Sequence, residues 1–186
     1  MSLTMKEKIL AAAEKRVRKA GFAEMSFRDL ASDVGIKSAS VHYHFPTKHT
    51  LGEALVDRYA KNFQAALEDL DTGTLRAALN GFVGLYANAL VLTEAICLCA
   101  VMGAEANGLP EDINRKTAAF FKANRVWLEA LLEKHGIDRA GDKALTLVAA
   151  LEGGMIIASA SNDKTLFDKV AETALQATIG SHTSKS

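Results

Sequence analysis

The sequence predicts an all-α protein of about nine helices. Its 186 residues include only two prolines, Pro46 and Pro110, and alanine is abundant throughout. Because proline breaks helices and alanine is the best helix former, this composition favours long, uninterrupted helices. Apolar residues make up 49% and charged residues 24%, which is typical of a globular protein with a sizeable core and excludes a disordered chain.

The first predicted helix begins after Thr4. Thr4 and Glu7 have the spacing of a capping box, in which each side chain binds a free backbone N–H of the first turn. Gly21 is placed where a left-handed residue would end this helix. Between them, apolar residues recur at helical spacing at Ile9, Leu10, Ala13, Val17 and Ala20.

Two short helices are expected next, joined by a turn that contains a glycine. Ser26 and Asp29 form a second capping box, and Gly35 ends the helix after two turns. Ser38 is expected to cap a third, very short helix, which Pro46 stops. Two short helices joined in this way, within residues 26–45, form a helix-turn-helix pattern.

The third helix carries side chains suited to duplex DNA. If Val41 and Phe45 face the core, its small Ser and Ala residues let the backbone approach a groove floor, and the longer residues reach phosphates. Arg28, in the first turn of the second helix, and Lys48, at the start of the fourth, add positive charge beside it. The predicted contact residues on this helix are Lys37, Ser38, Ala39, Ser40, His42, Tyr43 and His44.

The charge distribution agrees with a nucleic-acid partner for the N-terminal quarter. Residues 1–49 contain nine Lys and Arg against five Asp and Glu, whereas residues 50–186 contain thirteen against seventeen. A basic segment on an acidic body is expected to bind a polyanion.

Metal binding and catalysis are the alternatives for the histidine-rich stretch. His42 and His44 are two residues apart and do not share a helix face, so we expect neither a metal site there nor a cofactor. The sequence also lacks the glycine-rich, nucleophile and HExxH motifs of common enzyme classes, so no enzyme is expected. Cys97 and Cys99 are interpreted as buried structural thiols, with electrophile sensing as the alternative.

Further helices are expected along the rest of the chain. Thr47 should cap a fourth helix that runs from Lys48 to about Leu70. The predicted domains are residues 1–47 (helix-turn-helix), 48–70 (a connecting helix) and 71–186. Later helices are expected from about 74, at 96–106, 111–134, 138–159 and 163–179, followed by a polar, frayed tail at 181–186.

The stretch "FRDLASDVGIKSASVHYHFPTKHTLGEAL" resembles the DNA-binding domain of the TetR family of bacterial transcription regulators. The resemblance covers roughly residues 5–58. In that family a tyrosine, a histidine and the lysine after the proline commonly contact phosphate, and these positions fall on His42, Tyr43, His44 and Lys48. His42 stands where the family usually has tyrosine. The resemblance implies a homodimeric repressor that binds double-stranded DNA at a palindromic operator.

The resemblance also implies that residues 71–186 bind a small, mostly hydrophobic effector and form the dimer interface. The candidate effector residues are Phe82, Tyr86, Met102, Glu105, Phe121, Asn124, Trp127 and Met155, with core packing as the alternative role. Two glycines inside a strong helix suggest close packing with another helix. The candidate interface residues are Leu147, Leu151, Gly153, Gly154, Val170 and Ala174, with packing inside one subunit as the alternative.

A cytoplasmic location without a membrane partner is expected. The first residues lack the apolar segment of a signal peptide, and two cysteines fit a reducing compartment. The alternative function is an architectural or protein-interaction module that uses the helix-turn-helix as a scaffold.

Overall fold

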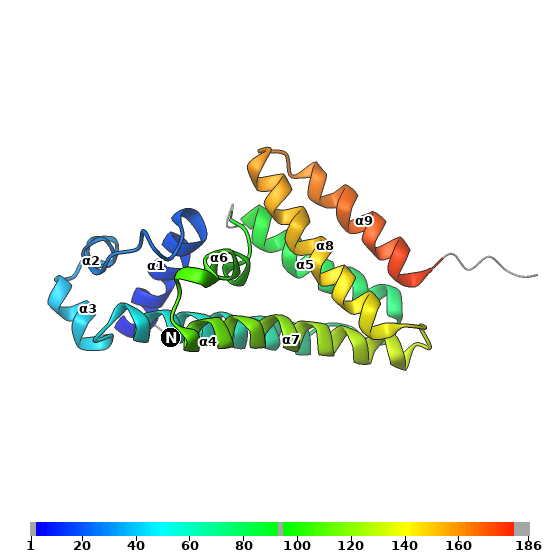
Figure 1. The fold of residues 1–186 in the computed structure, drawn as a ribbon, viewed down its shortest axis with the longest axis horizontal. Helices are drawn as coiled ribbons and strands as arrows, with labels where there is room; N and C mark the ends of the chain where they lie inside the picture. Colours follow the sequence, from blue (N-terminus) through cyan, green and yellow to red (C-terminus); the bar gives the residue numbers. More distant parts are fainter. Residues whose placement is uncertain (1–2, 93–94, 181–186) are drawn as a thin grey trace, which may run out of the picture. The chain divides into compact units, whose positions relative to one another are not determined.

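The structure, a computed structural model, describes residues 3–92 and 95–180 (Figure 1). The regular elements in these residues are helical, which confirms the all-α prediction. The predicted tail at 181–186 lies outside the described residues. The elements are α1 (Met5–Ala20), α2 (Phe27–Val34), α3 (Ser38–His44), α4 (Lys48–Glu68), α5 (Leu75–Leu92), α6 (Leu98–Ala104), the 3₁₀ helix η1 (Ala106–Gly108), α7 (Glu111–Lys134), α8 (Ala140–Ala160) and α9 (Thr165–Ile179).

The chain divides into two compact units. The N-terminal unit consists of the residues up to Phe63 together with Leu98–Phe120, and the C-terminal unit consists of Gln64–Cys97 and the residues from Phe121 onward. This division differs from the boundaries expected from sequence, because α6 and the start of α7 belong with the helix-turn-helix. Both α4 and α7 contribute residues to each unit.

The N-terminal unit is built around the apolar faces of its helices. Helix α1 packs against α2 and against α6, and α2 packs against α3. Inaccessible side chains from six helices form this core, so residues that are far apart in sequence stabilise the helix-turn-helix by excluding water. These side chains include Ile9, Val17, Leu30, Val41, Leu51, Leu55, Met102 and Ile113.

In the C-terminal unit α8 packs along α9, and both contact α5 (Figure 1). Gly154 of α8 permits the close approach of α9: a Cβ at this position would lie 3.1 Å from Val170 Cγ1 and 3.4 Å from Phe167 Cδ2. Among the helices of the described residues, α8 is long and apolar enough to cross a membrane by length and composition alone. In the structure 44% of its apolar segment is buried. A packed core helix has the same properties.

Most predicted helix ends agree with the structure, with two informative differences. The Thr4–Glu7 capping box is present, and Gly35 ends α2 in the left-handed region at φ 72°. The prediction that Ser38 caps α3 is wrong: Lys37 is the N-cap and supplies no side-chain bond. Helix α8 begins at Ala140 rather than 138, because Arg139 adopts a left-handed conformation that interrupts the expected run.

Candidate nucleic-acid interface

Local sequence signals position α3 on the surface of the N-terminal unit. The Ser26 hydroxyl accepts a hydrogen bond from the Asp29 N–H and starts α2. The left-handed Gly35 then reverses the chain, and the Ile36 N–H donates to the Ala31 carbonyl (2.9 Å). At the other end of the turn Val41 and Phe45 are buried, so the remaining faces of α3 are turned away from the core.

The outward side of α3 presents the side chains that the sequence predicted. Tyr43 is 84% exposed, which is unusual for a large aromatic residue. The His42 ring packs edge-on against Phe27 (4.7 Å between centroids), and the Tyr43 and His44 rings meet edge-on at 5.2 Å. These contacts restrict the rings while leaving polar atoms for an external partner. Lys37, Ser38, Ala39, His42 and Tyr43 are exposed, and Ser40 and His44 are half-buried.

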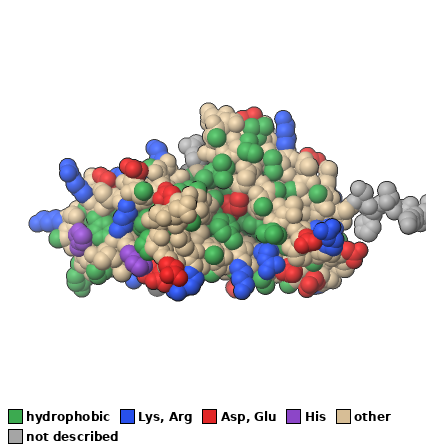
Figure 2. Space-filling model, in the orientation of Figure 1, with side chains coloured by type: hydrophobic (Ala, Val, Ile, Leu, Met, Phe, Trp, Pro, Cys, Tyr) green, Lys and Arg blue, Asp and Glu red, His purple; other side chains and the backbone are tan. Residues whose placement is uncertain are grey.

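Basic side chains lie around the helix-turn-helix. In Figure 2 blue Lys and Arg and purple His side chains gather over the end of the view where Figure 1 places α2 and α3. Arg28 and Lys37 are exposed there. Arg16, in contrast, forms a two-point ion pair with Asp33 (Nη2–Oδ1 2.8 Å), and this hydrogen-bonded guanidinium lowers the pKa of the Asp33 carboxyl.

Lys48 is held inside its own unit. Its Nζ donates to the Ala23 carbonyl (2.8 Å) and lies 5.0 Å from the centroid of the Phe22 ring. It therefore fixes the turn between α1 and α2. A phosphate contact by Lys48 stays a prediction, and it would use one of the two ammonium N–H groups that do not bind Ala23.

Glu105, predicted to line an effector pocket, holds the same turn from the other side. Its carboxylate accepts hydrogen bonds from the Phe22 N–H (3.0 and 3.1 Å to its two oxygens) and from the Ala23 N–H (3.1 Å). Gly21 precedes this turn at φ 91°, a backbone conformation that residues with a side chain rarely adopt, and a Cβ there would also displace Glu105 Oε1. No local pattern could have revealed these bonds, since 83 residues separate Glu105 from Phe22.

The structure brings together only part of the predicted effector set. Met102 and Glu105 lie in the N-terminal unit, and the other six lie in the C-terminal unit. Among these six, Phe82 stacks on Trp127 (5.6 Å, 12°) and lies 5.4 Å from Tyr86. Whether they bind an effector stays a prediction.

The buried polar side chains of the C-terminal unit include Asn124 and Glu152. Asn124 is inaccessible, and its Oδ1 accepts a bond from Gln64 Nε2 (3.1 Å), whereas its Nδ2 has no hydrogen-bond partner among the described residues. Burial, reinforced by Cys97, raises the pKa of the Glu152 carboxyl well above its ordinary value. The spare amide N–H of Asn124 is a donor that a ligand bound in this unit could use.

A groove of about 320 Å³ lies between α5 and α9 on the C-terminal unit. Its lining mixes charged and apolar side chains, among them Arg76, Leu79, Val83, Asp168 and Leu175. The six candidate effector residues of this unit belong to its core helices instead.

The predicted dimer residues pack mainly against other residues of the same protomer. Leu147 and Leu151 are fully buried, and Gly154 packs on Val170. Ala174 and Gly153 are half-buried. A Cβ added at Gly153 would meet no atom within 4 Å. The exposed apolar surface of α8 is formed by other residues, Leu145 (58%), Ile156 (47%) and Ile157 (50%).

Both cysteines are buried, as the structural interpretation of these thiols expects.

Comparisons with known proteins agree with this geometry. Residues 9–55 match the family described as bacterial regulatory proteins, tetR family, and residues 76–173, just over half of the chain, match the transcriptional regulator LmrA/YxaF-like C-terminal domain. A TetR transcriptional regulator from Legionella pneumophila is 29% identical (TM-score 0.90; 96% of this chain and 100% of that chain covered). A TetR-family regulator from Agrobacterium tumefaciens is 27% identical (TM-score 0.87; 93% and 96% covered). The chain matches no curated protein.

Proposed function

Because the chain belongs to the TetR family of bacterial transcription regulators, we propose that it is a dimeric repressor released from a palindromic operator by a small effector. The observation that carries the DNA-binding part is the outward side of α3. A seven-residue helix anchored by Val41 and Phe45 presents Tyr43 at 84% exposure beside small hydroxyl residues. The small residues of such a helix contact base edges, and its larger residues contact phosphates.

The dimer is supported by the apolar face of α8. Leu145 and Ile156 are eleven residues apart and lie on one side of this helix. The same face on a second copy would cover these side chains and remove apolar surface from water. Two recognition helices would then enter successive major grooves, about 34–36 Å apart.

The effector part is supported by the polar groups buried in the C-terminal unit. A small molecule with an apolar body and a polar group could use Asn124 Nδ2, which has no hydrogen-bond partner among the described residues. Such a ligand weakens DNA binding only if it binds the non-operator conformation better than the operator-bound one. Helices α4 and α7, which contribute to both units, are the continuous elements along which this preference would act.

Fluorescence anisotropy with duplex DNA from the region upstream of the coding gene, against a scrambled duplex at two salt concentrations, tests the proposal. A specific regulator should prefer its operator by at least about 10³-fold. Equal, steeply salt-dependent affinity for several upstream and scrambled duplexes would favour the architectural alternative.

Matched variants test whether α3 makes the contact. Lys37→Gln should weaken binding and reduce the salt slope by about one, as expected when one phosphate contact is lost. Lys61→Gln, an exposed lysine on α4, is the control for the same charge change. Equal effects of the two changes would contradict a contact through α3.

A further inference from the structure

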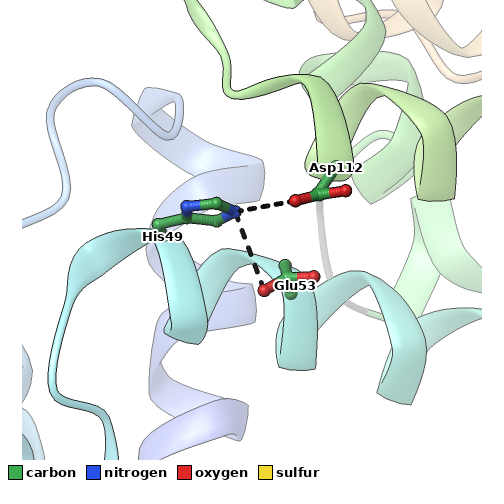
Figure 3. A group of neighbouring side chains, drawn as sticks. All are labelled: His49, Glu53 and Asp112. Atoms are coloured by element: carbon green, nitrogen blue, oxygen red, sulfur yellow. Dashed lines mark ion pairs between the residues drawn. The ribbon is translucent and has the colours of Figure 1, made fainter.

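A cluster of three metal-ligating side chains lies in the N-terminal unit, outside the predicted DNA contacts. His49 and Glu53 are four residues apart in the first turns of α4 and share a helix face, and Asp112 is in the first turn of α7. Figure 3 shows both carboxylates directed at the same nitrogen of His49. His49 Nε2 is 3.7 Å from Glu53 Oε2 and 3.8 Å from Asp112 Oδ2.

The His49 nitrogen between these carboxylates makes no other interaction among the described residues. His49 Nε2 is inaccessible to solvent and has no hydrogen-bond partner among the described residues. Its separations from both oxygens exceed the usual hydrogen-bond range of about 2.7–3.2 Å. A buried nitrogen flanked by two acceptor oxygens is satisfied either by a proton, which gives a shared ion pair, or by a metal ion.

The spacing suits a small transition-metal ion. Around a tetrahedral zinc ion with bonds of about 2.0–2.2 Å, neighbouring ligand atoms lie about 3.3–3.6 Å apart. The two separations in the cluster exceed this by a few tenths of an ångström, which small side-chain rotations can close. All three ligand atoms lie within 4.8 Å of one another, and the side chains are 31–44% exposed, so the cluster lies at the protein surface.

Neighbouring cations orient the carboxylates. Arg115 Nη2 binds Asp112 Oδ1 (2.6 Å), which leaves Oδ2 directed at His49. Lys116 lies 4.0 Å from Glu53 Oε1 and binds Asp57 (2.8 Å), so the second oxygen of Glu53 also remains for the cluster. Outer partners of this kind hold metal ligands in place.

From this geometry we propose that His49, Glu53 and Asp112 bind a divalent transition-metal ion of the zinc class, with water completing the coordination. One imidazole and two carboxylates suit such ions. The bound ion joins the first turns of α4 and α7 and stabilises the N-terminal unit. The expectation of no metal site was drawn from His42 and His44, and this site uses neither. It does not depend on the proposed repressor function.

Cobalt(II) and zinc(II) titrations of the chelator-treated full-length protein test the site. Co²⁺ should bind at one equivalent with visible absorption bands typical of four or five ligands, and Zn²⁺ should raise the melting temperature. Glu53→Gln and Asp112→Asn preserve side-chain shape and lie on different helices. Each should weaken binding by more than about 100-fold, because loss even of an outer partner costs about 10–100-fold.

Two controls separate this site from adventitious binding. Glu24→Gln removes an exposed carboxylate of the same unit, outside the cluster and its charged neighbours, and should leave the titration unchanged. The double variant His42→Gln/His44→Gln removes two other histidines of the N-terminal unit and should also leave it unchanged. The proposal is overturned if the wild type shows no saturable binding, or if Glu53→Gln and Asp112→Asn both bind the ion like wild type.

Discussion

Removing the Glu105 carboxylate should destabilise the turn between α1 and α2. Glu105→Ala leaves two backbone N–H donors without their acceptor, those of Phe22 and Ala23. Ala23 is exposed, so water can replace the lost bond there at little cost. Phe22 is buried, and a buried donor without a partner costs about 1–3 kcal/mol, which is therefore the expected loss in the free energy of unfolding.

Graded substitutions separate the hydrogen bonds from the charge. Glu105→Gln keeps one acceptor oxygen and should lose less stability than Glu105→Ala. Glu24→Gln removes the same charge from an exposed residue in the same turn and should change stability by less than about 0.5 kcal/mol.

Urea denaturation followed by circular dichroism measures the total effect. Amide hydrogen exchange at Phe22 and Ala23 reports locally, because both N–H groups should exchange faster in Glu105→Ala. If Glu105→Ala is no less stable than Glu24→Gln and exchange at Phe22 is unchanged, the carboxylate does not hold the turn.

Three further predictions concern the C-terminal unit. Gly153→Ala should raise the free energy of unfolding, measured by urea denaturation, by up to about 1 kcal/mol. Gly154→Ala should raise it by clearly less, because the new Cβ of residue 154 would crowd Val170. Equal gains in the two variants would contradict this packing. Because burial raises the pKa of Glu152, the folded state holds its proton more tightly than the unfolded chain, so stability falls as pH rises above the ordinary value of 4.5. Glu152→Gln should therefore be stabilising at about pH 8 and lose this advantage near pH 4.5, and a pH-independent difference in melting temperature would refute the shift. Ile156→Glu should reduce self-association in analytical ultracentrifugation, and an unchanged dimer would show that this face of α8 is not the interface.

Features that depend on neighbouring residues could be predicted from the sequence. The Thr4–Glu7 capping box and the left-handed Gly35 follow from short spacings, so α1, α2 and the turn before α3 were placed correctly. The buried faces of these helices follow from the helical period. The cap of α3 was misassigned because Ser38 has the residue type of a cap, whereas Lys37 has the backbone conformation of one.

Features that depend on long-range contacts could not be predicted. A single sequence does not show that Glu105 lies beside Phe22 or that Asp112 lies beside His49. On α8, Leu147 looks as suitable for an interface as Ile156, and only packing against other helices separates the buried residue from the exposed one. An effector pocket has no local signature for the same reason, since aromatic residues serve cores and pockets equally well.

The interrupted course of the chain through the N-terminal unit has a consequence for protein engineering. A hybrid regulator made by joining residues 1–47 to another sensory domain would omit Leu98–Phe120, and with it the acceptor of the Phe22 N–H. A recombinant exchange should instead transfer both segments, with crossover points near 63, 97 and 120. The first two crossovers fall near the end of α4 and at the start of α6. A library built on these junctions should yield more folded chimeras than one with a single junction after the helix-turn-helix.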